Sequence, residues 1–147
     1  KTIIAGRGFG KSTLIALIVN EPGSPAVSAW YLSTRSELVS AAWCVTEFGS
    51  ALGLKQRASQ LHADQARAAW ERFERLVAND LRLLPVEPAD FRRAALLTLD
   101  ATRGVRAGDA LHLACAERSG AKALATLDRV MAGNASRVRI RPLLLGA

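Results

Sequence analysis

The chain has 147 residues, half of them hydrophobic, and a formal net charge of +7. This length suits a single domain spanning 1–147, and the excess of arginine favours a polyanionic partner such as nucleic acid or an acidic protein. The longest apolar run, 14–19, is too short to cross a bilayer, and no signal-peptide pattern is visible at the start. We therefore expect a cytoplasmic protein without a membrane partner.

The predicted elements alternate between short apolar strands and amphipathic helices. The first is a buried strand at 2–5, which leads into the glycine-rich segment 6–10 and a helix capped by Ser12 or Thr13. Helices are then predicted at 26–32, 42–57, 64–77, 88–99, about 109–116 and 129–132, and strands at 37–40, 81–86, 124–126 and 138–140. This alternation predicts an α/β fold with a central parallel sheet of four to five strands and helices on both faces.

The two cysteines, Cys44 and Cys115, lie in apolar helical patterns and form no CxxC pair. We expect both to be reduced and buried, as free cysteines often are. With only two histidines in the chain, no set of ligands for a structural zinc site assembles.

Three carboxylates fall where predicted strands end and helices begin. Glu47 lies near the start of the helix at 42–57, Asp109 opens the helix before 116, and Asp128 ends the strand at 124–126. In a parallel sheet these positions share one edge, and clustered acids repel unless a cation neutralises them. Oxygen ligands of this kind suit Mg²⁺ or Mn²⁺. The alternative for each acid is a helix cap or an arginine partner.

Three segments carry a resemblance to a known family. They are Ser40 to Leu52, the string Gly104-Val-Arg-Ala-Gly-Asp-Ala-Leu-His-Leu-Ala114, and Ala123 to Asp128. Together they resemble the successive motifs of PIN domains, and most of all those of VapC-type ribonuclease toxins. The resemblance runs from about 12 to 140.

The resemblance implies a three-layer fold and metal-dependent endoribonuclease activity with Mg²⁺ or Mn²⁺. It also implies a homodimer that a cognate antitoxin inhibits. Glu47, Asp109 and Asp128 would take the positions of three catalytic, metal-binding acids, with Ser12, Arg106 and Thr126 in support. His112 lies one turn after Asp109, and we interpret it as a core histidine, with a position at the border of the groove as the alternative.

The front of the chain departs from this family, whose first strand ends in Asp-x-Ser. Aligned through Ser12, the position of that aspartate is Gly10, which Lys11 follows, and no acid occurs before Glu21. Loss of one carboxylate and a nearby ammonium group should weaken cation binding. A PIN-like domain that binds RNA or its antitoxin without cutting is therefore an alternative.

The same segment, Ala5 to Ser12, fits a loose P-loop pattern. In that alternative the backbone around Gly10 would bind phosphates, Lys11 would reach the β/γ oxygens, and Ser12 would hold Mg²⁺. A nucleotide-binding protein is the function that this pattern predicts.

Arginines supply the expected RNA surface. A terminal strand at 138–140 would place Arg137, Arg139 and Arg141 on one face. With Arg103, Arg106, Arg118 and Arg129 they would form a rim that binds phosphates around the acids.

Overall fold

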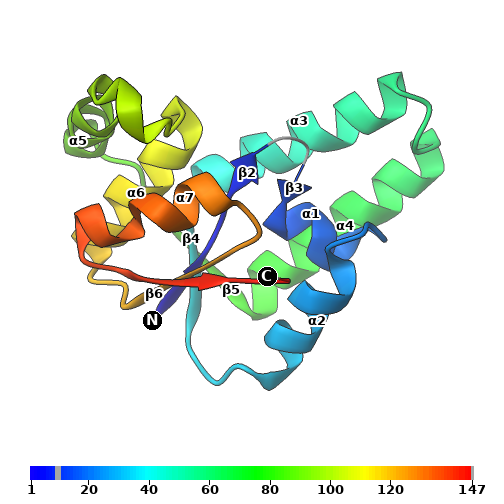
Figure 1. Cartoon of the computed structure of the whole chain (residues 1–147). Coiled ribbons are helices and arrows are strands. Elements are labelled where there is room, and N and C mark those ends of the chain that lie inside the picture. Colours follow the sequence, from blue (N-terminus) through cyan, green and yellow to red (C-terminus); the bar gives the residue numbers. More distant parts are fainter. Residues whose placement is uncertain (9–10, 147) are drawn as a thin grey trace.

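The computed structural model describes residues 1–8 and 11–146 of the chain (Figure 1). A five-stranded parallel sheet runs through it in the order β5-β4-β1-β6-β7. The strands are β1 (Thr2–Ile4), β4 (Leu38–Ala41), β5 (Leu81–Leu84), β6 (Ala123–Thr126) and β7 (Arg141–Leu144). The three central strands are buried along their whole length, as strands covered by helices on both faces must be.

Helices connect successive strands and cover both faces of the sheet. They are α1 (Thr13–Ile18), α2 (Ser24–Ser33), α3 (Trp43–Arg57), α4 (Ala63–Asn79), α5 (Pro88–Leu99), α6 (Ala107–Ser119) and α7 (Arg129–Asn134), with 3-10 turns η1 (Ala101–Arg103) and η2 (Ala135–Val138). A short antiparallel pair, β2 (Arg7–Gly8) and β3 (Lys11–Ser12), separates β1 from α1. Figure 1 shows α3 and α4 extending to one side as a pair of helices.

Two hydrophobic clusters lie on opposite faces of the sheet. Ile3 of β1 packs in the cluster that includes α5, α6 and η2, whereas Ile4 packs with α1, α3 and α4. Consecutive strand residues point to opposite faces, so this division places the sheet between two helical layers. The predicted three-layer α/β fold with a parallel sheet is confirmed.

The last predicted strand is wrong in position. Residues 138–140 were expected to form it, but Val138 ends η2, Arg139 has a positive φ of 60°, and the strand begins at Arg141. Val138 and Ile140 are nevertheless buried while Arg139 is exposed. A turn therefore produces the same alternation of burial that a strand would, and the sequence pattern cannot separate the two.

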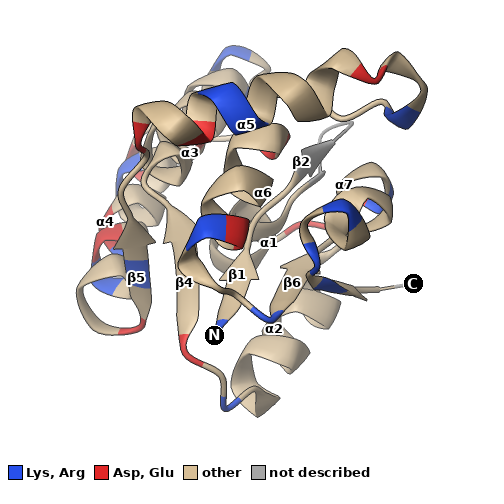
Figure 2. Ribbon diagram, turned by 90° about the vertical axis from the view of Figure 1, so that its left-hand side faces the viewer, with Lys and Arg blue, Asp and Glu red and all other residues tan. Residues whose placement is uncertain are grey.

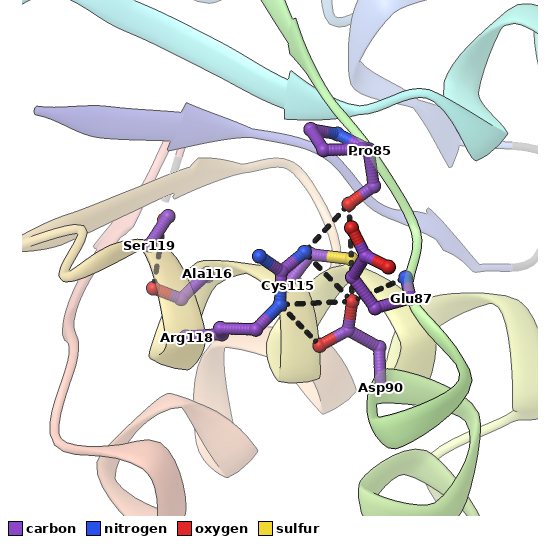
Figure 3. A network of polar contacts seen from close by, with 7 residues as sticks. All are labelled: Pro85, Glu87, Asp90, Cys115, Ala116, Arg118 and Ser119. Carbon is purple, nitrogen blue, oxygen red and sulfur yellow. Dashed lines mark hydrogen bonds and ion pairs between the residues drawn. The ribbon is translucent and has the colours of Figure 1, made fainter.

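The structure ties α5 to α6 through a buried carboxylate (Figure 3). Asp90, 2 % exposed, accepts hydrogen bonds from Arg118 Nε at 2.8 Å, from Arg118 Nη2 at 2.8 Å and from the Glu87 backbone N–H at 2.8 Å. The Arg118 guanidinium is the main cause that holds the pKa of Asp90 below its usual range. Arg118 also donates to the Pro85 carbonyl, so one side chain links the end of β5 to both helices.

Both cysteines are buried and free, as expected. Burial raises the pKa of the Cys44 thiol to about 11 and that of the Cys115 thiol to about 12, with Asp90 contributing at Cys115. None of the described helices is long and apolar enough to cross a membrane.

Candidate functional site

A cavity of about 1050 Å³ lies between α1, α3 and the beginning of α6. Four residues singled out from the sequence line it, namely Ser12, Glu47, Arg106 and Asp109. The rest of its wall is largely apolar, with Trp43, Ile15 and Leu54 among the lining residues. Glu21 and Lys55, which form an ion pair with each other, also line the cavity. The cavity therefore places the carboxylates of Glu47 and Asp109 and the guanidinium of Arg106 beside a surface suited to a ring or an alkyl chain.

Glu47 lies in the second turn of α3, and its side chain is 17 % exposed. One carboxylate oxygen pairs with Nε2 of His112, a residue of α6 that is 1 % exposed. The other oxygen lies against Gly108, where an added Cβ would sit 3.1 Å from it and 3.1 Å from the indole nitrogen of Trp43. Glu47 thus pairs with α6 through one oxygen, and its other oxygen occupies space that a side chain at position 108 would need.

Asp109 lies in the first turn of α6 and is only 6 % exposed. It lines the same cavity as Glu47. The helix dipole favours a negative charge at this end of α6. Arg106, at the N-cap position of the same helix, also lines the cavity, so α6 contributes charges of both signs.

Asp128 makes the helix-capping contacts that the sequence analysis gave as an alternative for each acid. It follows β6 and caps α7, because its Oδ1 accepts hydrogen bonds from the backbone N–H groups of Val130 at 2.9 Å and Met131 at 3.3 Å. Thr126 supports this turn by accepting a hydrogen bond from the Asp128 N–H at 3.0 Å. Neither Asp128 nor Thr126 lines the large cavity among the described residues.

Sequence reasoning missed the importance of Gly6. This glycine follows β1 with φ of +117°, and an added Cβ would overlap Thr126 Oγ1 and lie 3.3 Å from Asp128 Cβ. The alignment through Ser12 had pointed instead to Gly10, which lies outside the described residues. Counting from the end of the strand, rather than back from the helix, would have found Gly6 at the sheet edge beside Thr126 and Asp128.

Beyond Gly6 the chain leaves the sheet and returns to the same point. The Thr13 N–H donates to the Gly6 carbonyl at 3.2 Å, and the Thr13 hydroxyl donates to the Ala5 carbonyl at 3.0 Å. That hydroxyl also accepts from the Leu127 N–H at 3.1 Å. Strand β1, helix α1 and the end of β6 therefore meet at Thr13, and the described residues 7–8 and 11–12 form an excursion from this junction.

The backbone of the excursion pairs with itself. Arg7 is opposite Ser12 and Gly8 is opposite Lys11 in an antiparallel ladder. Ser12 Oγ accepts a hydrogen bond from the Ile15 N–H at 3.3 Å and so caps α1. A P-loop instead directs successive backbone N–H groups at one anion. The described part of this segment thus adds no support for phosphate binding by Lys11 and Ser12.

The donor set for a metal is smaller than the sequence predicted. Among the residues that the structure describes, no three His, Cys, Asp or Glu side chains are grouped closely enough to hold an ion. Glu47 and Asp109 nevertheless present carboxylates to one cavity. Mg²⁺ is often held by only one or two protein carboxylates, with water and substrate phosphate completing its shell, so these two residues fit such an ion.

The predicted arginine rim is dispersed. Arg118 is committed to Asp90, and Arg137 donates to Asn134 Oδ1 at 2.9 Å and to the Leu97 carbonyl at 3.2 Å. Arg106 is the member of the set that lines the cavity. Figure 2 shows Lys and Arg distributed over several helices and strands instead of a single element. The positively charged side chains are thus spread over several elements and do not form a single stripe of arginines.

Comparisons with known proteins agree with this architecture. The family model described as "PIN domain" matches residues 11–135. Among solved structures, a chain from "Structure of FitAB bound to IR36 DNA fragment" superposes with a TM-score of 0.66 at 18 % sequence identity, covering 97 % of this chain and 94 % of that chain. No protein with a curated description gives a significant match.

Proposed function

Because the chain belongs to the PIN-domain family, we propose that it is a metal-dependent endoribonuclease and the toxin of a toxin–antitoxin pair. The main observation that supports this proposal is that Glu47, Asp109 and Arg106 line the same cavity. The formal net charge of +7 supports a polyanionic substrate.

The two carboxylates would hold Mg²⁺ or Mn²⁺. When bound, such an ion lowers the pKa of a water molecule and stabilises charge on a phosphoryl group. Arg106 would bind a phosphate oxygen of the RNA, since a guanidinium recognises phosphate by paired hydrogen bonds. The apolar wall at Trp43 and Leu54 would hold a neighbouring base and exclude water.

The expected protein partners are those that the family resemblance implies. We expect a cognate antitoxin and a homodimer, as the VapC resemblance implies. The similar FitAB chain comes from a structure bound to a DNA fragment. That structure supports a role for this fold in assemblies on nucleic acid, while RNA as the substrate of this chain rests on the resemblance.

The test is cleavage of mixed RNA by the purified chain in Mg²⁺ or Mn²⁺, with EDTA as the metal-free control. Asp109→Asn and Glu47→Gln should each reduce the rate by roughly 100-fold or more, because loss of a direct ligand should cost at least as much as loss of an outer-shell partner. Asp64→Asn is the matched control, because it removes an exposed acid from α4. Cleavage that survives Asp109→Asn would contradict the proposal.

A second candidate is a PIN domain that binds RNA or its antitoxin without cutting. It is favoured by Gly6, which leaves no room for a side chain at the end of β1, and by Asp128, whose carboxylate caps α7. The same purified protein distinguishes the two functions. RNA binding without cleavage in either metal, unaffected by Asp109→Asn, would establish the second.

A further inference from the structure

His112 is a buried side chain beside the cavity that the proposed reaction leaves without a role. It belongs to α6, one turn after Asp109, and is 1 % exposed. Its Nε2 pairs with Glu47 across the boundary between α6 and α3. Its Nδ1 is buried and has no hydrogen-bond partner within the described part of the chain.

These contacts determine where the imidazole carries its proton. A buried N–H without a partner is more costly than a buried nitrogen lone pair, because N–H groups are rarely left unpaired in proteins. The proton therefore belongs on Nε2, which donates it to Glu47, and Nδ1 presents only its lone pair. This tautomer turns the histidine into a hydrogen-bond donor of fixed direction.

The same turn of α6 also locates the second oxygen of Glu47. That oxygen lies 3.1 Å from the position that a Cβ atom at residue 108 would occupy. The glycine therefore leaves room for the Glu47 carboxylate. Gly108 and His112 thus lie on either side of Asp109 in the sequence, and His112 pairs with one oxygen of Glu47 while the missing side chain of Gly108 leaves room for the other. One helix supplies one acid of the cavity and orients the other.

We propose that His112 is a positioning residue that holds the Glu47 carboxylate on the cavity wall beside Asp109. It acts through Glu47 and needs no contact with RNA. The consequence for the metal rests on the proposed function, because it assumes that both acids bind the ion. The contact itself can be tested independently of any activity.

The first experiment is ¹⁵N NMR of the imidazole groups. The chain contains only two histidines, so His62→Gln leaves His112 as the single source of signal. We expect the Nε2–H tautomer, with a shift of the Nε2 resonance when Glu47→Ala removes the acceptor. An Nδ1–H tautomer whose Nε2 carries no proton, or a spectrum unchanged by Glu47→Ala, would overturn the proposal.

The second experiment measures Mn²⁺ affinity by EPR in His112→Gln and His112→Leu, with thermal unfolding recorded for both. Gln carries an amide N–H₂ close to the place of Nε2, whereas Leu fills the space without a donor. Loss of an outer-shell partner costs about 10-fold or more in metal affinity, so Leu should show this loss and Gln should restore most of it. If His112→Gln and His112→Leu both fold and bind Mn²⁺ with equal affinity, the proposal that His112 positions Glu47 is contradicted.

The two experiments separate the possible failures. If the parent protein neither binds Mn²⁺ nor cleaves RNA, the proposed nuclease function fails, and the NMR result alone decides whether His112 holds Glu47. If the parent binds Mn²⁺ but Glu47→Ala leaves the imidazole spectrum of His112 unchanged, the nuclease proposal stands and the positioning role of His112 is rejected.

Discussion

At the scale of single residues, Gly6 is the most constrained position at the sheet edge. Its φ of +117° is rarely adopted by L residues, and its missing side chain leaves the space that Thr126 Oγ1 occupies. Replacing it combines backbone strain with overlap in a packed region. For the same reason, Gly6→Asp cannot simply restore the acid with which PIN domains end their first strand.

We predict that Gly6→Ala destabilises the fold by about 2 kcal/mol or more, from strain and overpacking together. The matching loss in melting temperature is roughly 4–8 °C for a chain of this size. Gly133→Ala serves as control, because an added Cβ in α7 meets nothing within 4 Å. Gly133→Ala should be neutral or stabilising. An unchanged melting temperature for Gly6→Ala would show that a side chain at position 6 is tolerated and would contradict the prediction.

Gly108→Ala tests the contact with Glu47. The new methyl group would meet Glu47 Oε2 and Trp43 Nε1 at 3.1 Å, so one of them must move. We expect a loss of RNA cleavage and Mn²⁺ affinity of about 10-fold, as for other disturbed supports of metal ligands. Unfolding should change by less than about 1 kcal/mol, since alanine suits a helix better than glycine. A large loss of stability with unchanged affinity would contradict a role in placing Glu47.

The candidate site was predictable in part. Glu47 could be placed because it follows the boundary between β4 and α3, and Asp109 because it opens a helix within the string that resembles a family motif. The contact of Glu47 with His112 could not, since it depends on how α3 meets α6. Asp128 could have been a ligand or a cap, and the sequence pattern is the same for both. Gly6 was missed because the excursion at 7–12 shifts the register between strand and helix.

At the scale of elements, the joint between α5 and α6 depends on one carboxylate. The pKa of Asp90 is lowered in the folded protein, chiefly by Arg118. A lowered pKa contributes stability above the unfolded value of about 3.9, and that contribution is lost as the pH falls through the folded value. The joint should therefore weaken in acid and be intact at neutral pH.

Asp90→Asn should lower the free energy of unfolding at pH 7 by roughly 3 kcal/mol, because it leaves part of the Arg118 guanidinium without its partner. Below pH 4 the difference from the parent should shrink, since the parent loses the same charge there. Urea unfolding at several pH values measures both effects, with Asp64→Asn on exposed α4 as control. A difference that stays constant from pH 7 to pH 2 would contradict the assignment.

Among the elements, those with a long periodic pattern were the easiest to predict. The helix at 64–77 and the strands at 2–5 and 37–40 lie within a residue or two of α4, β1 and β4. The last strand was displaced because β7 is an edge strand whose residues are exposed or half-buried and include Pro142. An edge strand needs neither an apolar run nor every backbone donor, so its sequence carries little signal.

At the scale of the whole molecule, the net charge of +7 should govern affinity for RNA more than any single arginine does. We predict that binding of a single-stranded RNA, measured in EDTA, weakens steeply with salt. Arg106→Gln should reduce the slope of log K against log salt by roughly 0.7, the value for one phosphate contact on a single strand. Arg35→Gln, an equal charge change at an exposed loop residue before β4, should leave the slope nearly unchanged. Equal effects of the two variants would show that Arg106 makes no phosphate contact.

The junction at Thr13 has a consequence for how this chain can change in length. Gly6 and Thr13 are hydrogen-bonded although six residues lie between them. Strand and helix are thus joined twice, once by the covalent chain and once by Thr13. Because the cost of closing a loop grows slowly with its length, a segment anchored in this way can be shortened, lengthened or exchanged at little cost to the fold. The edge of the sheet that carries Asp128 is therefore also a place where this protein can acquire new sequence without losing the junction of strand and helix.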